Sequence, residues 1–204
     1  IITILCWSTV ATAFKFGLRH QNPPQLLAGA TLASTIILLI IVVINGKFHR
    51  LFRYSYKDYL LSALAGFLNP FFYYYILFRA YDILQAQVAQ PLNMIWPIVL
   101  VLISIPFLGQ KIKARSILAL FISFSGVVLI SSQGGGESFQ PGQLPGIFLA
   151  LGSAIVWAFY WILNMKDKRD DMMKLFLGFF FAMLYLLIIQ IFPGSGFPES
   201  TNAW

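Results

Sequence analysis

The stretch ALAGFLNPFFYYYILFRAYDILQAQVAQPLNMIWPIVLVLISIPFLGQKIKARSILALFISFSGVVLI, residues 63–130, decides the fold of this chain. It contains most of one long apolar segment at residues 59–78 and all of two more at 86–108 and 116–131, separated by short connectors. A helix needs roughly 20 mostly apolar residues to cross the hydrocarbon core of a bilayer. Each segment is near that length and holds no Asp or Glu, so the stretch predicts three membrane-spanning helices.

Four further apolar segments flank this stretch, at residues 1–18, 26–44, 144–163 and 175–192. The charged fraction of the chain is 10%, against about 25% in soluble domains. A soluble domain has no interior large enough for seven buried helices. The sequence therefore predicts an all-α polytopic membrane protein with seven transmembrane helices.

The cations are concentrated in every second connector. Eleven of the 14 Lys and Arg residues lie in the second, fourth and sixth connectors. Because Lys and Arg in short loops stay on the cytoplasmic side, residue 1 is predicted to be cytoplasmic and residue 204 external. The Gly-rich connector 133–143 holds no cation and is predicted to be an external linker.

Composition argues against several other classes of protein. The net charge of +7 follows the connectors and is interrupted by lipid-facing segments, so we expect no nucleic-acid binding. The single cysteine, Cys6, gives no disulfide framework and no metal-ligand spacing. A membrane enzyme would need an embedded nucleophile and base or a metal cluster, but His20 and His49 both lie in connectors. We therefore expect no catalytic residues, no metal site and no cofactor.

A weak internal repeat relates the two ends of the chain. Sliding the sequence by 149 residues places Leu26 on Leu175, the first segment over the sixth and the second over the seventh. Five segments separate the copies, so the second copy would be inverted in the membrane. Inverted repeats with an odd helix count are typical of secondary transporters.

Several motifs in the quoted stretch resemble the EamA branch of the drug/metabolite transporter (DMT) superfamily. They are N-P-x-x-Y-Y at residues 69–74, W-P at 96–97, G-[EQ]-K at 109–111 and G-V-V-L-I at 126–130. Residues 6–19 and 151–166 look like the first helix of each family repeat. The resemblance implies ten helices in two inverted five-helix repeats around a central cavity. Residues 1–132 would form the first repeat, 133–143 the linker, and 144–204 two helices of the second.

This resemblance predicts a secondary transporter in the bacterial inner membrane. Its partners would be the lipid bilayer and a small-molecule metabolite, such as an amino acid or a similar amphipathic solute, moved by alternating access and exported. Every Asp and Glu lies in or beside a connector, so no carboxylate at membrane depth relays protons. The alternatives are a non-transporting membrane scaffold and a seven-helix receptor-like protein. The oligomeric state stays open.

Amides at predicted membrane depth are the first candidates for substrate binding. Asn69 and Tyr73 flank Pro70, which removes a backbone donor and breaks the helix, as in helices that line cavities; a packing kink is the alternative. Gln90 and Asn93, together with Gln87, are predicted to project to a similar side, because amides that face lipid are costly. Hydrogen bonds between helices are the alternative for them.

Aromatic and basic residues complete the candidate substrate site. Trp96 and Trp157 are predicted to be cavity walls. Lys15 would attract a carboxylate if it points inward and would otherwise snorkel to the surface. The 149-residue shift places Lys15 on Asn164, which is therefore a candidate for substrate binding as well. We also expect the small residues Gly66 and Gly126 to allow close helix contacts.

Overall fold

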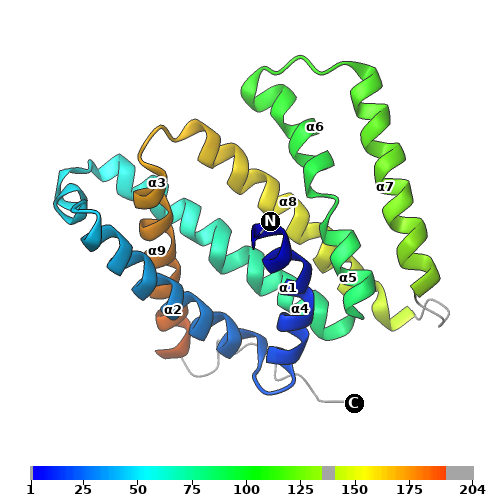
Figure 1. The fold of residues 1–204 in the computed structure, drawn as a ribbon, viewed down its shortest axis with the longest axis horizontal. Helices are drawn as coiled ribbons and strands as arrows, with labels where there is room; N and C mark the ends of the chain where they lie inside the picture. The colour runs from blue at the N-terminus through cyan, green and yellow to red at the C-terminus, as the bar shows by residue number, and fades with distance from the viewer. Residues whose placement is uncertain (1, 135–140, 192–204) are drawn as a thin grey trace.

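The computed structural model describes residues 2–134 and 141–191, and every regular element in those residues is helical. The elements, shown in Figure 1, are α1 (Ile2–Leu18), α2 (Pro23–Ile44), the 3-10 helix η1 (Phe48–Arg53), α3 (Tyr56–Gly66), the π-helical turn η2 (Phe67–Phe72), α4 (Tyr73–Ile83), α5 (Ala86–Asn93), α6 (Trp96–Leu108), α7 (Ala114–Gly134), the 3-10 turn η3 (Pro141–Gln143), α8 (Leu144–Lys166) and α9 (Asp171–Ile191). The predicted all-helical class is confirmed for the described residues.

Five helical segments in the described residues are long and apolar enough to cross a membrane. They are Pro23–Ile44, Tyr56–Ile83, Ala86–Leu108, Leu144–Lys166 and Asp171–Ile189, which correspond to the second, third, fourth, sixth and seventh predicted segments. The first predicted segment is the 17-residue helix α1, and the apolar part of the fifth is the shorter Ala114–Gly126. The membrane class is therefore confirmed, whereas the count of seven spans stays a prediction.

Local sequence signals explain where the helices begin and end. Pro lies in the first turn of α2, α6 and α8, where its missing N–H costs no hydrogen bond. The side chain of Ser55 caps α3 by accepting from the Asp58 N–H at 3.3 Å. Gly109 ends α6 with a positive φ of 66°, a conformation that glycine adopts without steric cost.

The third predicted span is interrupted at its middle. Asn69 leaves helical geometry with φ −149° and ψ 126°, directly before Pro70. The helix resumes through η2 into α4, so α3, η2 and α4 form one broken span, Tyr56–Ile83. The fourth predicted span is likewise divided into α5 and α6, which are separated by Met94 and Ile95. The break predicted from Pro70 is therefore confirmed.

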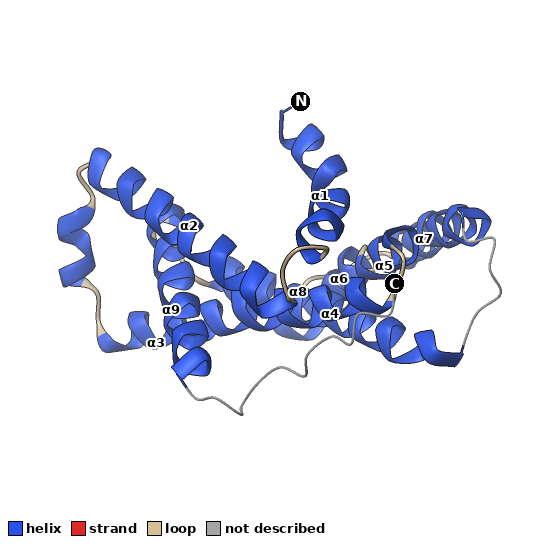
Figure 2. Ribbon diagram, turned by 90° about the horizontal axis from the view of Figure 1, so that it is seen from below, coloured by secondary structure: helices blue, strands red, loops and turns tan. Residues whose placement is uncertain are grey.

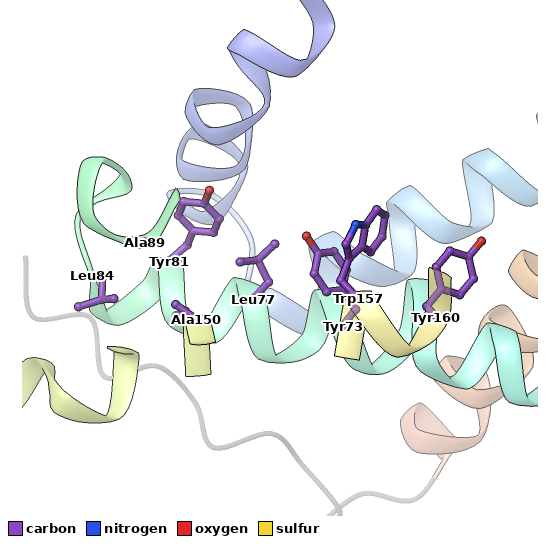
Figure 3. Packing of buried hydrophobic residues seen from close by; sticks show 9 residues of the cluster. Tyr73, Leu77, Tyr81, Leu84, Ala89, Ala150, Trp157 and Tyr160 are labelled. Carbon is purple, nitrogen blue, oxygen red and sulfur yellow. The ribbon is translucent and has the colours of Figure 1, made fainter. Parts of the chain in front are cut away.

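The main core lies between α4 and α8. Its buried members come from α4, its C-cap Leu84, α5 and α8: Tyr73, Leu77, Ala80, Tyr81, Leu84, Ala89, Ala150, Trp157 and Tyr160. Figure 3 shows this cluster from close by, with Tyr73, Trp157 and Tyr160 on the same side of α4 and α8. Small buried residues repeat along α8 at Ala150, Ser153 and Ala154, and such spacing lets two helix backbones approach closely. By contrast, α1 projects out of the layer formed by the other helices (Figure 2).

The cation-rich connectors lie at one side of the molecule. In Figure 1 the α2–α3, α6–α7 and α8–α9 connections lie toward the upper and left edges, and the α1–α2 and α4–α5 connections lie toward the lower edge. Lys47 Nζ and Asp170 Oδ2, 2.6 Å apart, join the first of these connections to the third. Arg169 Nη1 donates to the backbone carbonyl of Asp58 at 2.8 Å. This arrangement agrees with the alternation of charge along the sequence.

The two glycines expected at close helix contacts behave differently. A Cβ added to Gly66 would overlap the backbone carbonyl oxygen of Gly178 on α9, so Gly66 does bring two helices together. A Cβ on Gly126 would meet no described atom within 4 Å. The expectation for Gly126 is therefore wrong: α7 lies at the edge of the molecule (Figure 1), and this position packs against no described neighbour.

Candidate functional site

A cavity of about 220 Å³ lies between α1, α4 and α5. It is lined by Val10, Phe14, Tyr73, Tyr74, Leu77, Gln90, Asn93 and Met94. This lining combines aromatic rings and aliphatic chains with two amides and two phenol hydroxyls, and it includes no carboxylate. Mostly apolar walls with a few polar groups that fix orientation are the usual composition of a small-molecule site.

A chain of hydrogen bonds connects this cavity to α8. The Tyr73 hydroxyl donates to Asn93 Oδ1 at 3.2 Å, and Asn93 Nδ2 donates to Ser153 Oγ at 2.8 Å. The Ser153 hydroxyl in turn donates to the Ala150 carbonyl at 2.7 Å. Asn93 is 2% exposed and Ser153 is fully buried. In a buried setting, such a satisfied network holds each side chain in one orientation.

The Asn93 amide keeps hydrogen-bonding capacity beyond this chain. An amide oxygen has two lone pairs and an amide nitrogen has two N–H groups, and the chain uses one of each. Because Asn93 also lines the cavity, a guest molecule that carries both a donor and an acceptor could bind to it.

Aromatic rings stand beside the polar chain. The ring centroids of Tyr73 and Trp157 are 4.5 Å apart, and Trp157 lies 6.4 Å from Trp96 and 5.7 Å from Tyr160. Figure 3 shows Tyr73, Trp157 and Tyr160 next to one another between α4 and α8. Such rings present flat apolar surfaces whose faces are electron-rich. They would suit an apolar or aromatic part of a ligand.

A second polar contact fixes Gln90. The Tyr81 hydroxyl donates to Gln90 Oε1, and Tyr81 is fully buried. Gln90 lines the same cavity as Asn93, as the sequence predicted. Gln87, which was expected to face a similar side, is exposed in the first turn of α5.

A smaller cavity, of about 20 Å³, lies at the helix break near the cation-rich side. Its polar lining is Asn69, Tyr160, Asn164, Asp167, Arg169 and Lys174. Asn164 Nδ2 donates to the Tyr160 hydroxyl at 3.2 Å. Asn69 Oδ1 is buried and accepts no hydrogen bond from any residue that the structure describes. The volume suffices for about one water molecule.

Charged side chains close this smaller cavity at the α8–α9 connection. Arg169 binds Asp167 through two nitrogens, Nε to Oδ1 at 2.9 Å and Nη2 to Oδ2 at 2.6 Å. Burial raises the pKa of Asp167, but the hydrogen bonds from Arg169 outweigh that effect and hold the pKa below its ordinary value. Both side chains are mostly buried. The pair therefore stays ionised at neutral pH.

The structure distributes the eight predicted site residues among four places. Tyr73, Gln90 and Asn93 line the first cavity, and Trp96 and Trp157 stand beside it. Asn69 and Asn164 line the second cavity instead. Lys15 lines neither cavity: it is half-buried in the last turn of α1, within electrostatic range of Asp82.

The sequence prediction did not include five of the eight residues that line the first cavity, nor two residues that hold its polar groups. Phe14 lines the first cavity, Tyr81 orients Gln90, and Ser153 anchors Asn93. Ser153 could have been found, because it lies four residues before Trp157 and thus on the same face of α8. In the described part of the chain, no three His, Cys, Asp or Glu side chains lie close enough to hold a metal ion.

Comparisons with known proteins agree with the fold and the motifs. The profile of the EamA-like transporter family matches residues 1–132. The chain is 27% identical over 203 residues to the "Uncharacterized transporter YvbV" of Bacillus subtilis, covering 98% of this chain and 60% of the relative. It is 26% identical over 168 residues to the "Aromatic amino acid exporter YddG" of Ancylobacter novellus, covering 81% of this chain and 56% of the relative.

Two further matches concern location and fold. The "Uncharacterized inner membrane transporter YhbE" of Escherichia coli is 25% identical over 166 residues, covering 78% of this chain and 50% of the relative. The chain thus spans between half and 60% of the length of these curated relatives. A solved crystal structure covers 96% of this chain and 67% of its own length with a TM-score of 0.71 at 20% identity, which shows the fold alone.

The family profile covers well over half of the chain, and the described residues contain five helices fit to cross a membrane. Relatives of the chain are named as transporters, one of them in the bacterial inner membrane. The chain is a multi-pass membrane protein and belongs to the EamA-like transporter family.

Proposed function

We propose that the full-length protein is a secondary transporter that exports a small amphipathic metabolite across the bacterial inner membrane. The observation that carries this proposal is the cavity lined by Tyr73 and Asn93. There Asn93 is hydrogen-bonded to Tyr73 and Ser153, and the Tyr73 ring packs against Trp157. The family and the names of the relatives support it.

The proposed architecture has two inverted repeats, and the helix ends support this register. Shifting the chain by 149 residues carries Leu18, the end of α1, to Asp167, and α8 ends at Lys166. The same shift carries Pro23, the start of α2, to Met172, and α9 begins at Asp171. Residues 1–132 would then form the first repeat with five spans. Residues 144–204 would provide two spans of the second, after the linker 133–143.

The lining of the site favours a particular class of substrate. Its volume of about 220 Å³ lies below the range of about 300–1,000 Å³ of drug-sized ligand sites, so a small metabolite fits. The amides and hydroxyls would bind its polar groups, and Trp96 and Trp157 would contact an apolar or aromatic part. Amino acids with such side chains are the leading candidates, and the name of the exporter YddG agrees with this choice.

The proposed mechanism is alternating access. On the cation-rich side, which the distribution of charge predicts to be cytoplasmic, α3 packs on α9 at Gly66, and Arg169 ties the α8–α9 connection to α3. The first cavity lies near the break of the span to which α3 belongs: Tyr73, Tyr74 and Leu77, which line it, are in the first half of α4, and Gln90 and Asn93 are in the last turn of α5. The contacts of Gly66 and of Arg169 support a state that is closed on the cytoplasmic side. Opening that side would require two contacts to break: the hydrogen bond from Arg169 to the Asp58 carbonyl and the ion pair between Lys47 and Asp170.

The test is transport by the full-length protein in liposomes loaded with labelled aromatic or branched amino acids. Asn93→Ala should reduce counterflow at least tenfold, because it removes the amide that would bind both a donor and an acceptor of the substrate. Gln87→Ala, an exposed amide on the same helix, should leave counterflow unchanged. Each variant is first checked for monodispersity and for its unfolding midpoint.

Two outcomes would contradict the proposal. Wild-type flux that survives Asn93→Ala in a folded protein would show that the cavity does not bind the substrate. No flux of any tested metabolite through folded wild-type protein would favour a membrane scaffold instead.

A further inference from the structure

A groove of about 510 Å³ runs between α2 and α9 at the cation-rich side of the molecule. It is lined by Leu32, Thr35, Ile36, Leu39, Phe48, Leu51, Phe52, Tyr59, Phe176, Leu177, Phe180 and Met183. This groove shares no lining residue with either cavity described above. It is therefore separate from the proposed transport site.

The two polar side chains of the groove use their hydroxyls within the protein. The Thr35 hydroxyl donates to the Thr31 carbonyl at 2.7 Å, and the Tyr59 hydroxyl donates to the Leu51 carbonyl. What remains for an occupant is hydrocarbon and aromatic surface. An occupant that fits must present a long apolar part.

The helix η1 carries two arginines next to residues that line this groove. Side chains three residues apart eclipse one another in a 3-10 helix, so Phe48 and Leu51 form one row and Arg50 and Arg53 form another. The first row lines the groove, and both arginines are exposed. Figure 1 shows η1 at the edge of the molecule, where α2 meets α3.

These arginines differ from the neighbouring Lys47. Lys47 is bound to Asp170 at 2.6 Å, whereas none of the ion pairs between described residues includes Arg50 or Arg53. Arg50 is close enough to Asp170 to act on its carboxylate, which Lys47 already binds. Two exposed cations beside an apolar groove suit an occupant with an anionic head and an apolar tail. An apolar helix would fill the groove but would bring no anionic group to these cations.

We propose that this groove binds an acyl chain of an anionic glycerophospholipid from the leaflet on the cation-rich side, with the phosphate held by Arg50 and Arg53. Basic residues between transmembrane helices on the cytoplasmic side are suited to anionic headgroups, and guanidinium groups bind phosphate oxygens in pairs. The exposed Phe52 ring, 79% accessible, would lie at the level of the headgroups. The proposal does not depend on which solute the protein transports.

The test measures binding of phosphatidylglycerol and phosphatidylcholine to the full-length protein by native mass spectrometry after detergent purification. A juxtamembrane cation changes lipid affinity by about fivefold, so Arg50→Gln with Arg53→Gln should weaken phosphatidylglycerol binding by roughly 25-fold and leave phosphatidylcholine unchanged. The control is Lys111→Gln with Lys113→Gln, which removes two exposed cations from the α6–α7 connection and should have little effect.

A second variant tests the groove itself. Leu39→Trp fills part of the groove without altering any charge, and it should weaken the binding of phosphatidylglycerol although both arginines remain. Equal losses in the two cation variants would show diffuse attraction rather than a site and would overturn the proposal. Unchanged binding in folded Leu39→Trp protein would overturn it as well, and so would a disulfide cross-link between two copies of the Ile36→Cys protein.

Discussion

Gly66 on α3 lies directly against the backbone of Gly178 on α9, but the two glycines are not equivalent. A Cβ on Gly66 would overlap the Gly178 carbonyl oxygen, whereas a Cβ on Gly178 would lie 3.9 Å from the Gly66 Cα. The Tyr185 hydroxyl donates to the Ala63 carbonyl at 3.0 Å close to this crossing. The absence of a side chain at Gly66 therefore sets how closely the broken span Tyr56–Ile83 approaches α9.

This asymmetry predicts different effects of two matched substitutions. Gly66→Ala should lower the free energy of unfolding by about 1–3 kcal/mol, because the backbone of α9 would have to move. Gly178→Ala should be neutral or stabilising by up to about 1 kcal/mol, since alanine favours a helix and its methyl group fits. Denaturant unfolding of both variants in detergent micelles checks this. Equal destabilisation by both would contradict the packing described for Gly66.

Helix breaks and helix ends could be predicted from the sequence where local residues alone determine them. Pro70 predicted the break at Asn69. Proline lacks the backbone N–H that a helix needs, and this effect does not depend on what the helix packs against. The ends of the fourth predicted span also agree with the structure, since length and apolarity alone define them.

Contacts between distant helices could not be predicted in the same way. Asn93 and Ser153 are 60 residues apart, and their hydrogen bond depends on how α5 crosses α8. Asn69 was predicted to share a site with Tyr73, but the break turns it toward Asn164 and the smaller cavity. The failure at Gly126 has the same origin, because a small residue permits close packing but does not supply the neighbour.

The hydrogen bond between Tyr73 and Asn93 predicts coupling between two substitutions. Tyr73→Phe leaves Asn93 Oδ1 without this donor, and Asn93→Ala leaves the Tyr73 hydroxyl without its acceptor, so each should cost about 1–3 kcal/mol of stability. The double variant should cost less than the sum by about 0.5–3 kcal/mol, because the second change removes the group that the first left unpaired. A double-mutant cycle on unfolding free energies measures this. Additive values would indicate that the two side chains act independently.

The contacts of Arg169 predict that a positive charge alone is not enough to stabilise the α8–α9 connection. The Arg169 guanidinium binds both carboxylate oxygens of Asp167, donates to the Asp58 carbonyl and lies over the Tyr54 ring at 5.4 Å. Arg169→Lys keeps the charge but cannot make these contacts together, so it should lower the free energy of unfolding by about 1–3 kcal/mol. Lys168→Arg, at the adjacent exposed position, is the control and should be neutral. Full stability in Arg169→Lys would show that a point charge suffices there.

The ion pair between Lys47 and Asp170 predicts a dependence of stability on pH. The hydrogen bond from Lys47, only partly opposed by burial, holds the pKa of the Asp170 carboxyl below its ordinary value of 3.8. Since the folded-state pKa is the lower one, the contribution is fully present well above pH 3.8 and is lost as the pH falls through the folded-state value. The pair is partly exposed, so the contribution should not exceed about 1 kcal/mol.

The measurement is the unfolding midpoint between pH 6 and pH 3 for wild-type protein and for Asp170→Asn. The difference in stability between the two should be largest near pH 6 and should shrink as the medium becomes acidic, because protonation removes from the wild type the same charge that the substitution removes. Asp171→Asn is the matched control: Asp171 also contacts a lysine, Lys174 at 2.7 Å, but its side chain is 95% exposed, and solvent screens such a pair. A difference for Asp170→Asn that stays constant down to pH 3 would mean that the carboxylate is not the stabilising group. The connections of α2–α3 and α8–α9 would then be held together by packing and by Arg169 alone.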